Sequence, residues 1–382
     1  MDRETTIATL SAMMKLREVD RDQEMLGRAV EIPIDVYTSH DIFDRELVTA
    51  FKNYPLVVGH VAHVARPGSY LLGVWNRLPI VVLRDQTGKL RAFLNICRHR
   101  GARIVSGREP ELKALVCPFH GWTYALDGTL KGVTKPHNFP GLDKEQYRLR
   151  ELPVVEHLGL IWVHPDAGAT IDAADYLGEQ LSSEIEHFRL DGLALHRRSV
   201  RTLNANWKLL LKTYLERYHV PILHRNTIGP VFEKGVIVHH EHGPNMRLAA
   251  ARTNLNDASA VDPSNWRVLD FASVFYTLFP NTFLINHANL VSLNSFYPLA
   301  PDRTIWTHDM LYRVEDYAGE EGQDALAKRF ANIDTVFHAE DFGIVEEVQE
   351  NLLASAGQRH LCGLEEGLLA MFQQSVDQAM GS

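Results

Sequence analysis

Two short stretches, Cys97-Arg-His-Arg-Gly101 and Cys117-Pro-Phe-His-Gly-Trp122, decide how the first half of this sequence folds. Each stretch contains a cysteine, then a histidine two or three positions later, and then a glycine, and seventeen residues separate His99 from Cys117. Thiolate sulfur and imidazole nitrogen are both metal ligands, and one short loop can present both of them to the same site. The spacing therefore predicts two ligand-bearing loops that meet at a common metal site.

The residues around the two loops form short β-rich runs that alternate with turns. Strand-like runs such as Ile80-Val-Val-Leu83 and Leu90-Arg-Ala-Phe-Leu94 are separated by turn residues such as Gln86-Thr-Gly88. Strands of about five residues between glycine and proline turns are typical of a small antiparallel β domain. We predict this domain over residues 46–165, with both loops inside it.

The remaining sequence predicts a larger domain of mixed structure. Residues 206–220 show helical periodicity, residues 271–315 hold strand-like aromatic and β-branched runs, and helical patterns return from Asp324 onward. A helix, a sheet and further helices in this order predict an α+β fold. We expect residues 166–382 to form this larger domain, with residues 1–45 packed on it as a helical segment.

Composition argues against several classes of protein. The chain has 382 residues, of which 45% are hydrophobic and 23% charged, as in globular proteins and unlike disordered or coiled-coil chains. Its net charge of −9 disfavours binding to nucleic acid or to an anionic membrane. Three cysteines are too few for a disulfide framework, and no signal peptide or membrane-spanning run is visible. We therefore expect a cytoplasmic protein.

Two cysteines and two histidines are the ligand set of a Rieske [2Fe–2S] centre, in which the histidines hold one iron and the cysteines hold the other. The same four residues can also make a structural zinc site. Zinc fingers usually pair cysteine with cysteine, whereas this chain pairs Cys97 with His99 and Cys117 with His120. The order favours the iron–sulfur cluster, which is a one-electron carrier, over zinc.

A second pair of candidate ligands stands at the end of the predicted helix 206–220. His219 and His224 are five positions apart, which would put them on different faces of an ideal helix. Pro221 interrupts the helix, so the chain can swing His224 back toward His219. Two histidines and one carboxylate, with open coordination positions, form the ligand set of non-haem Fe(II) oxygenases.

The acidic stretch 339–352 supplies the carboxylate. Its pattern is helical, and Glu340 falls on a solvated row. Asp341 instead shares the face of three apolar residues that should turn inward, which are Val345, Val348 and Leu352. Periodicity therefore predicts Asp341 as the third iron ligand.

The cysteine–histidine stretches resemble the cluster-binding boxes of Rieske non-haem iron oxygenases, the large subunits of ring-hydroxylating and related oxygenase systems. The flanking Phe93-Leu-Asn-Ile96 and Thr123-Tyr-Ala-Leu-Asp-Gly128 fit this family too, and the C-terminal half resembles it more loosely. The resemblance implies a catalytic domain of the helix-grip type, with an antiparallel sheet flanked by helices. It also implies that the last iron ligand is an aspartate in a Glu-Asp helix, which agrees with Asp341.

The resemblance further implies a reaction and its partners. Such an oxygenase uses O₂ and electrons from a separate NAD(P)H-dependent reductase or ferredoxin to mono- or dihydroxylate, or to demethylate, a small organic substrate. The sequence shows no glycine-rich nucleotide fingerprint, in agreement with a separate donor. Family members usually assemble as homotrimers.

Glu216 matches a position where family members carry an acid that bridges a cluster histidine to an iron histidine. We expect it to project from the same helical face as His219, three residues later. Glutamate in this place resembles the pattern of members that act on quaternary ammonium substrates. Thr213 departs from the family, which often has asparagine there.

Four aromatic residues are candidates for a substrate pocket, namely Phe275, Tyr276, Phe283 and Tyr297. Aromatic rings bind a flat ring by stacking and a quaternary ammonium group by cation–π contact. We predict an aromatic substrate, with a quaternary ammonium compound as the alternative and a non-catalytic electron-transfer protein as a third reading. His239-His-Glu-His242 is a rival metal cluster, but strand neighbours point to opposite faces, so we expect a surface or rim segment there.

Overall fold

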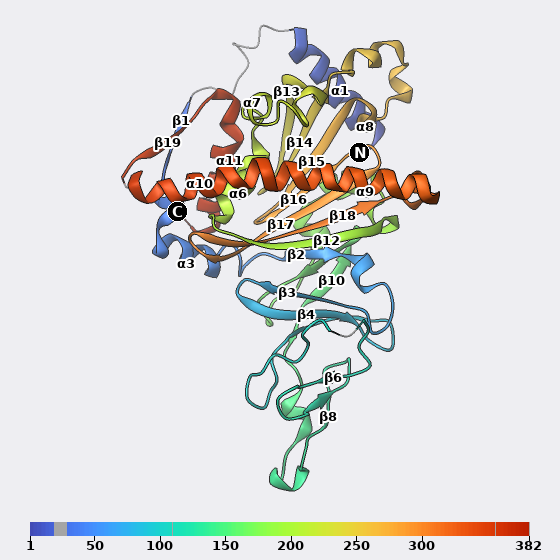
Figure 1. Cartoon of the computed structure of the whole chain (residues 1–382), viewed down its shortest axis with the longest axis vertical. Coiled ribbons are helices and arrows are strands. Elements are labelled where there is room, and N and C mark those ends of the chain that lie inside the picture. The colour runs from blue at the N-terminus through green and yellow to red at the C-terminus, as the bar shows by residue number, and fades with distance from the viewer. Residues whose placement is uncertain (19–28, 109, 356, 382) are drawn as a thin grey trace. The chain divides into compact units, whose positions relative to one another are not determined.

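Figure 1 shows the computed structural model of the chain, which describes residues 1–381 apart from 19–28, 109 and 356. The chain divides into two compact units. Phe51–Tyr176 form the smaller unit, and Met1–Ala50 join Leu177–Ser382 in the larger one. All strand pairs among the described residues are antiparallel, and most of the described helices belong to the larger unit, so the fold is α+β as predicted. Within the described residues, no helix is long and apolar enough to cross a membrane.

The smaller unit contains three sheets, with strand orders β10-β11-β2, β3-β4-β5-β9 and β6-β7-β8. The hairpin from β3 to β4 turns on Asn76 and Arg77, whose positive φ angles of 47° and 61° suit a two-residue turn. The strands are β2 (Leu56–His60), β3 (Tyr70–Trp75), β4 (Leu78–Arg84), β5 (Leu90–Leu94), β6 (Leu115–Val116), β7 (Thr123–Tyr124), β8 (Leu130–Gly132), β9 (Glu151–Leu152), β10 (Val154–His157) and β11 (Leu160–Val163).

The two ligand-bearing loops are anchored in the core of the smaller unit. Cys97 and Cys117 are both buried members of its hydrophobic core. The side-chain oxygen of Asn95, just before the first loop, accepts hydrogen bonds from the N–H groups of Ile104 and Val105 at 3.1 and 2.9 Å. These contacts fix the first loop at both of its ends.

The larger unit is built on a seven-stranded sheet with the order β12-β18-β17-β16-β15-β14-β13. Strands β13 to β18 follow one another as a meander, and β12 lies beside β18. The strands are β12 (Ala194–Leu203), β13 (Phe232–His242), β14 (Asn245–Arg252), β15 (Ala272–Leu278), β16 (Thr282–Asn286), β17 (Leu290–Ala300) and β18 (Arg303–Tyr312).

Side chains of this sheet alternate between two faces. Opposed pairs such as Phe283 with Asn294, Asn294 with His308, and Phe296 with Trp306 lie on the same face. We call this side the inner face of the sheet. Its alternating positions include Phe275, Phe283, Asn294, Phe296, Trp306 and His308.

One long helical run covers the inner face. Helix α9 (Gly319–Thr335) continues into the π-helical segment η10 (Val336–Phe342) and then into α10 (Gly343–Leu352), and α9 crosses the strands in Figure 1. Phe330 of α9 stacks parallel to His308, with 6.3 Å between ring centroids, and Phe337 of η10 meets Trp306 edge-on at 5.8 Å. The other α-helices are α1 (Arg3–Glu18), α2 (Asp35–Thr38), α3 (His40–Val48), α4 (Ala173–Leu177), α5 (Glu179–Glu186), α6 (Trp207–Lys212), α7 (Val220–Leu223), α8 (Val268–Phe271) and α11 (Gly367–Ala379).

Two predictions of local structure are wrong. The helix predicted over 206–220 is interrupted, because α6 ends at Lys212 and the 3-10 turn η5 (Thr213–Leu215) separates it from α7. The N-terminal 45 residues are not wholly helical, because β1 (Val30–Pro33) pairs with β19 (Arg359–Cys362) near the other end of the sequence. Residues 19–28 of that predicted segment lie outside the described residues. Local periodicity contains no information on such distant partners.

Candidate functional site

The two cysteine–histidine loops of the smaller unit have the same backbone geometry. In each loop the cysteine N–H donates to the carbonyl five positions on, and the glycine N–H donates to the cysteine carbonyl. The N···O distances are 2.8 and 3.0 Å in loop 97–102, and 2.8 and 2.9 Å in loop 117–122. Gly101 and Gly121 have φ angles of 77° and 68°, which only glycine adopts at no steric cost. The repeated turn explains why both sequence boxes end on glycine.

The side chains of these loops form a thiol pair and an imidazole pair. Cys97 and Cys117 are buried free thiols, and burial raises the pKa of the Cys97 thiol. The rings of His99 and His120 lie 4.7 Å apart and are only partly buried. Nδ1 of His99 is buried without a hydrogen-bond partner in the described residues. Burial, together with His120, lowers the pKa of His99, which favours the neutral form that binds metals.

The arrangement fits a two-iron cluster better than a single zinc ion. In the part of the chain that the structure describes, the only three metal-ligating atoms gathered within 4.8 Å of one another come from other residues. The thiols and imidazoles of the loops are therefore not gathered around one point, as a tetrahedral zinc ion would require. Two separate pairs of ligands suit a [2Fe–2S] centre held by two cysteines and two histidines.

Tyr124 of β7 completes this site. Its hydroxyl lies 3.4 Å from Sγ of Cys97 and accepts a hydrogen bond from the Arg98 N–H at 3.1 Å. Because the lone pair accepts from Arg98, the hydroxyl proton is available to the sulfur. Burial raises the pKa of Tyr124, so it stays a neutral donor. A hydrogen bond to a cluster sulfur is one of the features that set a reduction potential.

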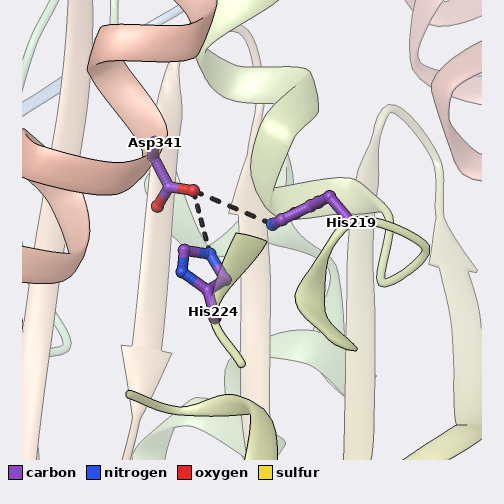
Figure 2. A group of neighbouring side chains, drawn as sticks. All are labelled: His219, His224 and Asp341. Carbon is purple, nitrogen blue, oxygen red and sulfur yellow. Dashed lines mark ion pairs between the residues drawn. The ribbon is translucent and has the colours of Figure 1, made fainter. Parts of the chain in front are cut away.

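A second group of ligands comes together in the larger unit. One ring nitrogen each from His219 and His224 and one carboxylate oxygen from Asp341 lie within 4.8 Å of one another. Oδ1 of Asp341 lies 3.0 Å from Nε2 of His224 and 3.8 Å from Nε2 of His219 (Figure 2). His224 and Asp341 are buried, and His219 is partly exposed. The structure thus brings together the three residues predicted as iron ligands.

Each histidine of this triad is held at its other nitrogen by a carboxylate. Nδ1 of His219 contacts Oε1 of Glu216, and Nδ1 of His224 lies 2.7 Å from Oε2 of Glu340. Carboxylates of this kind orient a metal-binding histidine and leave its Nε2 for the metal. Two oriented imidazoles and one carboxylate fit a non-haem Fe(II) ion with open positions.

The backbone around His219 differs from the sequence prediction. Glu216 has an extended backbone (φ −127°, ψ 160°), so it does not share a helical face with His219. It instead precedes the four-residue helix α7, where its Oε2 accepts a hydrogen bond from the His219 N–H at 3.1 Å. Pro221 lies in the first turn of α7 and starts this helix, rather than bending a longer one. His219 and His224 flank the two ends of α7, which brings their rings to 5.1 Å.

Glu340 is the functional residue that sequence reasoning missed. An ideal α-helix puts it on a solvated row, but η10 is π-helical, and this wider turn directs both Glu340 and Asp341 toward His224. Thr227 also donates to Oε2 of Glu340, at 2.7 Å. Burial disfavours a proton on His224, but Asp341 and Glu340 outweigh it and raise the pKa of this histidine. The only local sequence feature that could have pointed to Glu340 is its position next to Asp341.

The predicted pocket residues divide between the two faces of the sheet. Phe275 and Phe283 lie on the inner face, with 5.8 Å between their rings, and Phe283 contacts Tyr214 at 5.0 Å. Tyr276 and Tyr297 occupy the alternate positions and point to the opposite face, so their assignment to the pocket is wrong. The prediction grouped these aromatic residues by their closeness in sequence. In a strand, however, consecutive side chains point to opposite faces of the sheet.

Tyr214 packs on Phe283 of the inner face, and the charge of the triad residue Asp341 acts on it. Its hydroxyl is buried and has no hydrogen-bond partner in the described residues, and its ring also meets Phe337 at 5.7 Å. Burial and the charge of Asp341 both raise the pKa of Tyr214. The tyrosine therefore remains a neutral donor near the triad.

Two other features of the sequence take no part in the triad. His239 to His242 lie on β13, and they are not among the three ligating atoms that gather in the described part of the chain. Thr213 donates its hydroxyl to the Leu209 carbonyl at 3.0 Å, within its own helical turn. Its side chain therefore supports the end of α6.

Comparison with known families covers most of the chain. Residues 55–153 match the Rieske [2Fe-2S] domain. Residues 160–382, which are more than half of the chain, match the catalytic domain of the ring hydroxylating alpha subunit. The two matched domains contain the two ligand groups described above, one each.

Relatives are similar over different lengths. The oxygenase subunit of carnitine monooxygenase from Acinetobacter pittii is 28% identical over 361 residues, which are 90% of this chain and 92% of that protein. A solved structure of a quaternary ammonium Rieske monooxygenase with its substrate gamma-butyrobetaine has a TM-score of 0.77 at 25% identity, covering 92% of this chain and 96% of that chain. The alpha subunit of benzene 1,2-dioxygenase from Pseudomonas putida is 35% identical over 178 residues, which are 46% of this chain and 39% of that protein.

Proposed function

Because the chain belongs to the ring-hydroxylating alpha-subunit family, we propose that it is a terminal Rieske oxygenase with its mononuclear iron on His219, His224 and Asp341. The [2Fe–2S] cluster would be held by Cys97, His99, Cys117 and His120. The observation that supports this most is the pair of histidine Nε2 atoms directed at one buried carboxylate, in a chain that also carries the two Rieske loops.

The bound groups supply single electrons and O₂ activation, which side chains cannot provide. Monooxygenation then places one oxygen atom in a C–H bond of the substrate and reduces the other to water, using two electrons and two protons. Glu216 and Glu340 hold the iron histidines in one orientation during this reaction. The buried aromatic residues of the inner face restrict access of water, and the neutral Tyr214 hydroxyl offers a hydrogen bond near the triad.

A quaternary ammonium compound is the substrate class that we favour. Among the curated relatives, the carnitine monooxygenase subunit matches 90% of this chain, whereas the benzene dioxygenase subunit matches 46% of it. The aromatic side chains of the inner face, Phe275 and Phe283 among them, suit a cation that carries methyl groups. An aromatic hydrocarbon is the second candidate, because the benzene dioxygenase subunit shows higher identity over a shorter segment.

We further propose that electrons come from a separate NAD(P)H-dependent reductase or ferredoxin and that the chain forms a homotrimer in the cytoplasm. In that assembly Glu216 would connect His219 to a cluster histidine of a neighbouring copy, in addition to orienting His219. Sedimentation of the purified protein should give the mass of about three chains. A monomer with full turnover would contradict this arrangement.

Metal analysis and turnover of one anaerobic preparation test the proposal. We expect about three irons and two acid-labile sulfides per chain. With a surrogate reductase, gamma-butyrobetaine or carnitine should be oxidised, and benzene and naphthalene should not. Oxidation of the aromatic compounds alone would favour the second candidate. About two irons and no product would support the cluster but contradict the mononuclear iron site. Zinc without sulfide would contradict both the cluster and the iron site.

A further inference from the structure

Arg217 places an unsatisfied guanidinium beside the proposed iron ligands. Its Nη2 atom is buried and donates no hydrogen bond to any described residue. Glu216 and Asp341 act on it through charge, and within the described residues no hydrogen bond joins either carboxylate to it. Both oxygens of Glu216 are already engaged by His219, and Oδ1 of Asp341 faces the histidine Nε2 atoms. A buried donor without a partner is costly, which points to a ligand that is not part of the chain.

The guanidinium is fixed by aromatic contacts that leave its donors available. Its carbon atom Cζ lies 4.0 Å from the centre of the Phe232 ring and 5.8 Å from that of Phe275. Contact with the ring faces restrains the guanidinium plane but uses none of its N–H groups. A restrained guanidinium with an open donor edge matches the two oxygens of a carboxylate.

The aromatic residues continue from Arg217 toward the triad. Phe275 packs on Phe283 at 5.8 Å, and Phe283 packs on Tyr214 at 5.0 Å. Tyr214 lies close enough to Asp341 for the aspartate to influence its hydroxyl. Contacts between neighbouring rings therefore connect the guanidinium of Arg217 with Tyr214.

We propose that Arg217 binds a carboxylate of the substrate, so that the substrate is a zwitterion with a quaternary ammonium group and an acid. This inference rests on the proposed function and narrows its substrate class. The ammonium group would lie on the aromatic rings near the triad, and the acid would pair with Arg217. A quaternary ammonium compound without an acid would bring its charge toward a buried guanidinium of the same sign, which disfavours binding.

The experiment compares gamma-butyrobetaine with its primary amide, which has the same shape without the negative charge. Wild type should prefer the acid over the amide by about 100-fold in kcat/KM, mainly through KM. Arg217→Met should remove this preference, because kcat/KM for the acid should fall about 100-fold while that for the amide should rise, by no more than about threefold. Arg217→Lys, which keeps the charge but not the planar fork, should recover part of the preference.

Two measurements separate recognition from damage to the metal site. Iron content and cluster absorbance of the Arg217 variants should equal those of wild type. Equilibrium dialysis of gamma-butyrobetaine without an electron donor should show the same loss of affinity as KM. Arg225→Met is the matched control, because Arg225 directly follows the iron ligand His224 but is exposed. This variant should prefer the acid over the amide as strongly as wild type does.

The outcomes distinguish the inference from the function on which it rests. If wild type oxidises the acid and the amide equally well, the role of Arg217 is overturned and the proposed function stands. This comparison holds even if the Arg217 variants fail to fold. If wild type neither binds nor oxidises either compound, the quaternary ammonium assignment is wrong, and the zwitterion inference fails with it.

Discussion

The two metal sites of this chain are built in opposite ways. The cluster ligands come from two copies of one loop, between residues 97 and 120, and each loop is closed by its own backbone hydrogen bonds. The triad instead joins His219 and His224, at the ends of a four-residue helix, to Asp341 in a π-helical turn. The first site is specified by local backbone geometry. The second depends on the packing that brings distant segments together, so supporting residues matter more there.

Asp341→Ala should have the largest effect, because it removes a proposed ligand. Loss of a residue that only supports a metal ligand typically weakens metal binding roughly 10–100-fold, and loss of Asp341 should weaken iron binding by more than that. Turnover should be lost together with the iron. The visible absorbance of the cluster should persist, since its ligands belong to the other unit. Iron analysis and the absorbance spectrum of the same sample test this. Full activity would rule out Asp341 as a ligand.

Glu216→Gln and Glu340→Gln should have smaller and different effects. Glu340→Gln should weaken iron binding about tenfold, with near-normal turnover per bound iron, because Glu340 only orients His224. Glu216→Gln should keep near-normal iron content but lose more than about tenfold in turnover per bound iron, if Glu216 also couples the two centres.

Iron titration followed by single-turnover measurements at matched occupancy would compare these two variants. The control is Glu347→Gln, an exposed acid on α10, which should match wild type in both quantities. If the two variants have the same iron affinity and the same turnover per bound iron, Glu216 only orients His219 and does not couple the two centres.

Tyr124→Phe should have the smallest effect. Without the hydroxyl near Sγ of Cys97, the reduced cluster loses a hydrogen bond, and the reduction potential should fall. A fall of about 50 mV corresponds to nearly a tenfold change in a one-electron equilibrium. Tyr147→Phe is the control, because its ring packs on Trp122 and its hydroxyl donates no hydrogen bond within the described residues. An unchanged potential in the Tyr124 variant would show that the hydroxyl does not donate to the sulfur.

The candidate ligands themselves were predictable from the sequence. Cys97, His99, Cys117 and His120 stand in repeated local patterns, and a short loop needs no distant partner to present its side chains. His219, His224 and Asp341 were also predicted, but the local reasons were incomplete, because Pro221 begins α7 and Asp341 lies in a π-helical turn. The α+β class followed from strand and helix patterns in the same way.

The surroundings of the triad were decided only by the tertiary structure. Glu340 faces His224 because η10 departs from α-helical geometry, and Glu216 reaches His219 from an extended backbone after α6 has ended. The alternation of β15 and β17 kept Phe275 inside and sent Tyr297 to the other face. Residue types fix which chemistry is available at a position. Which side chains meet depends on packing between distant segments and on irregular turns, whose free energies arise only in the folded chain.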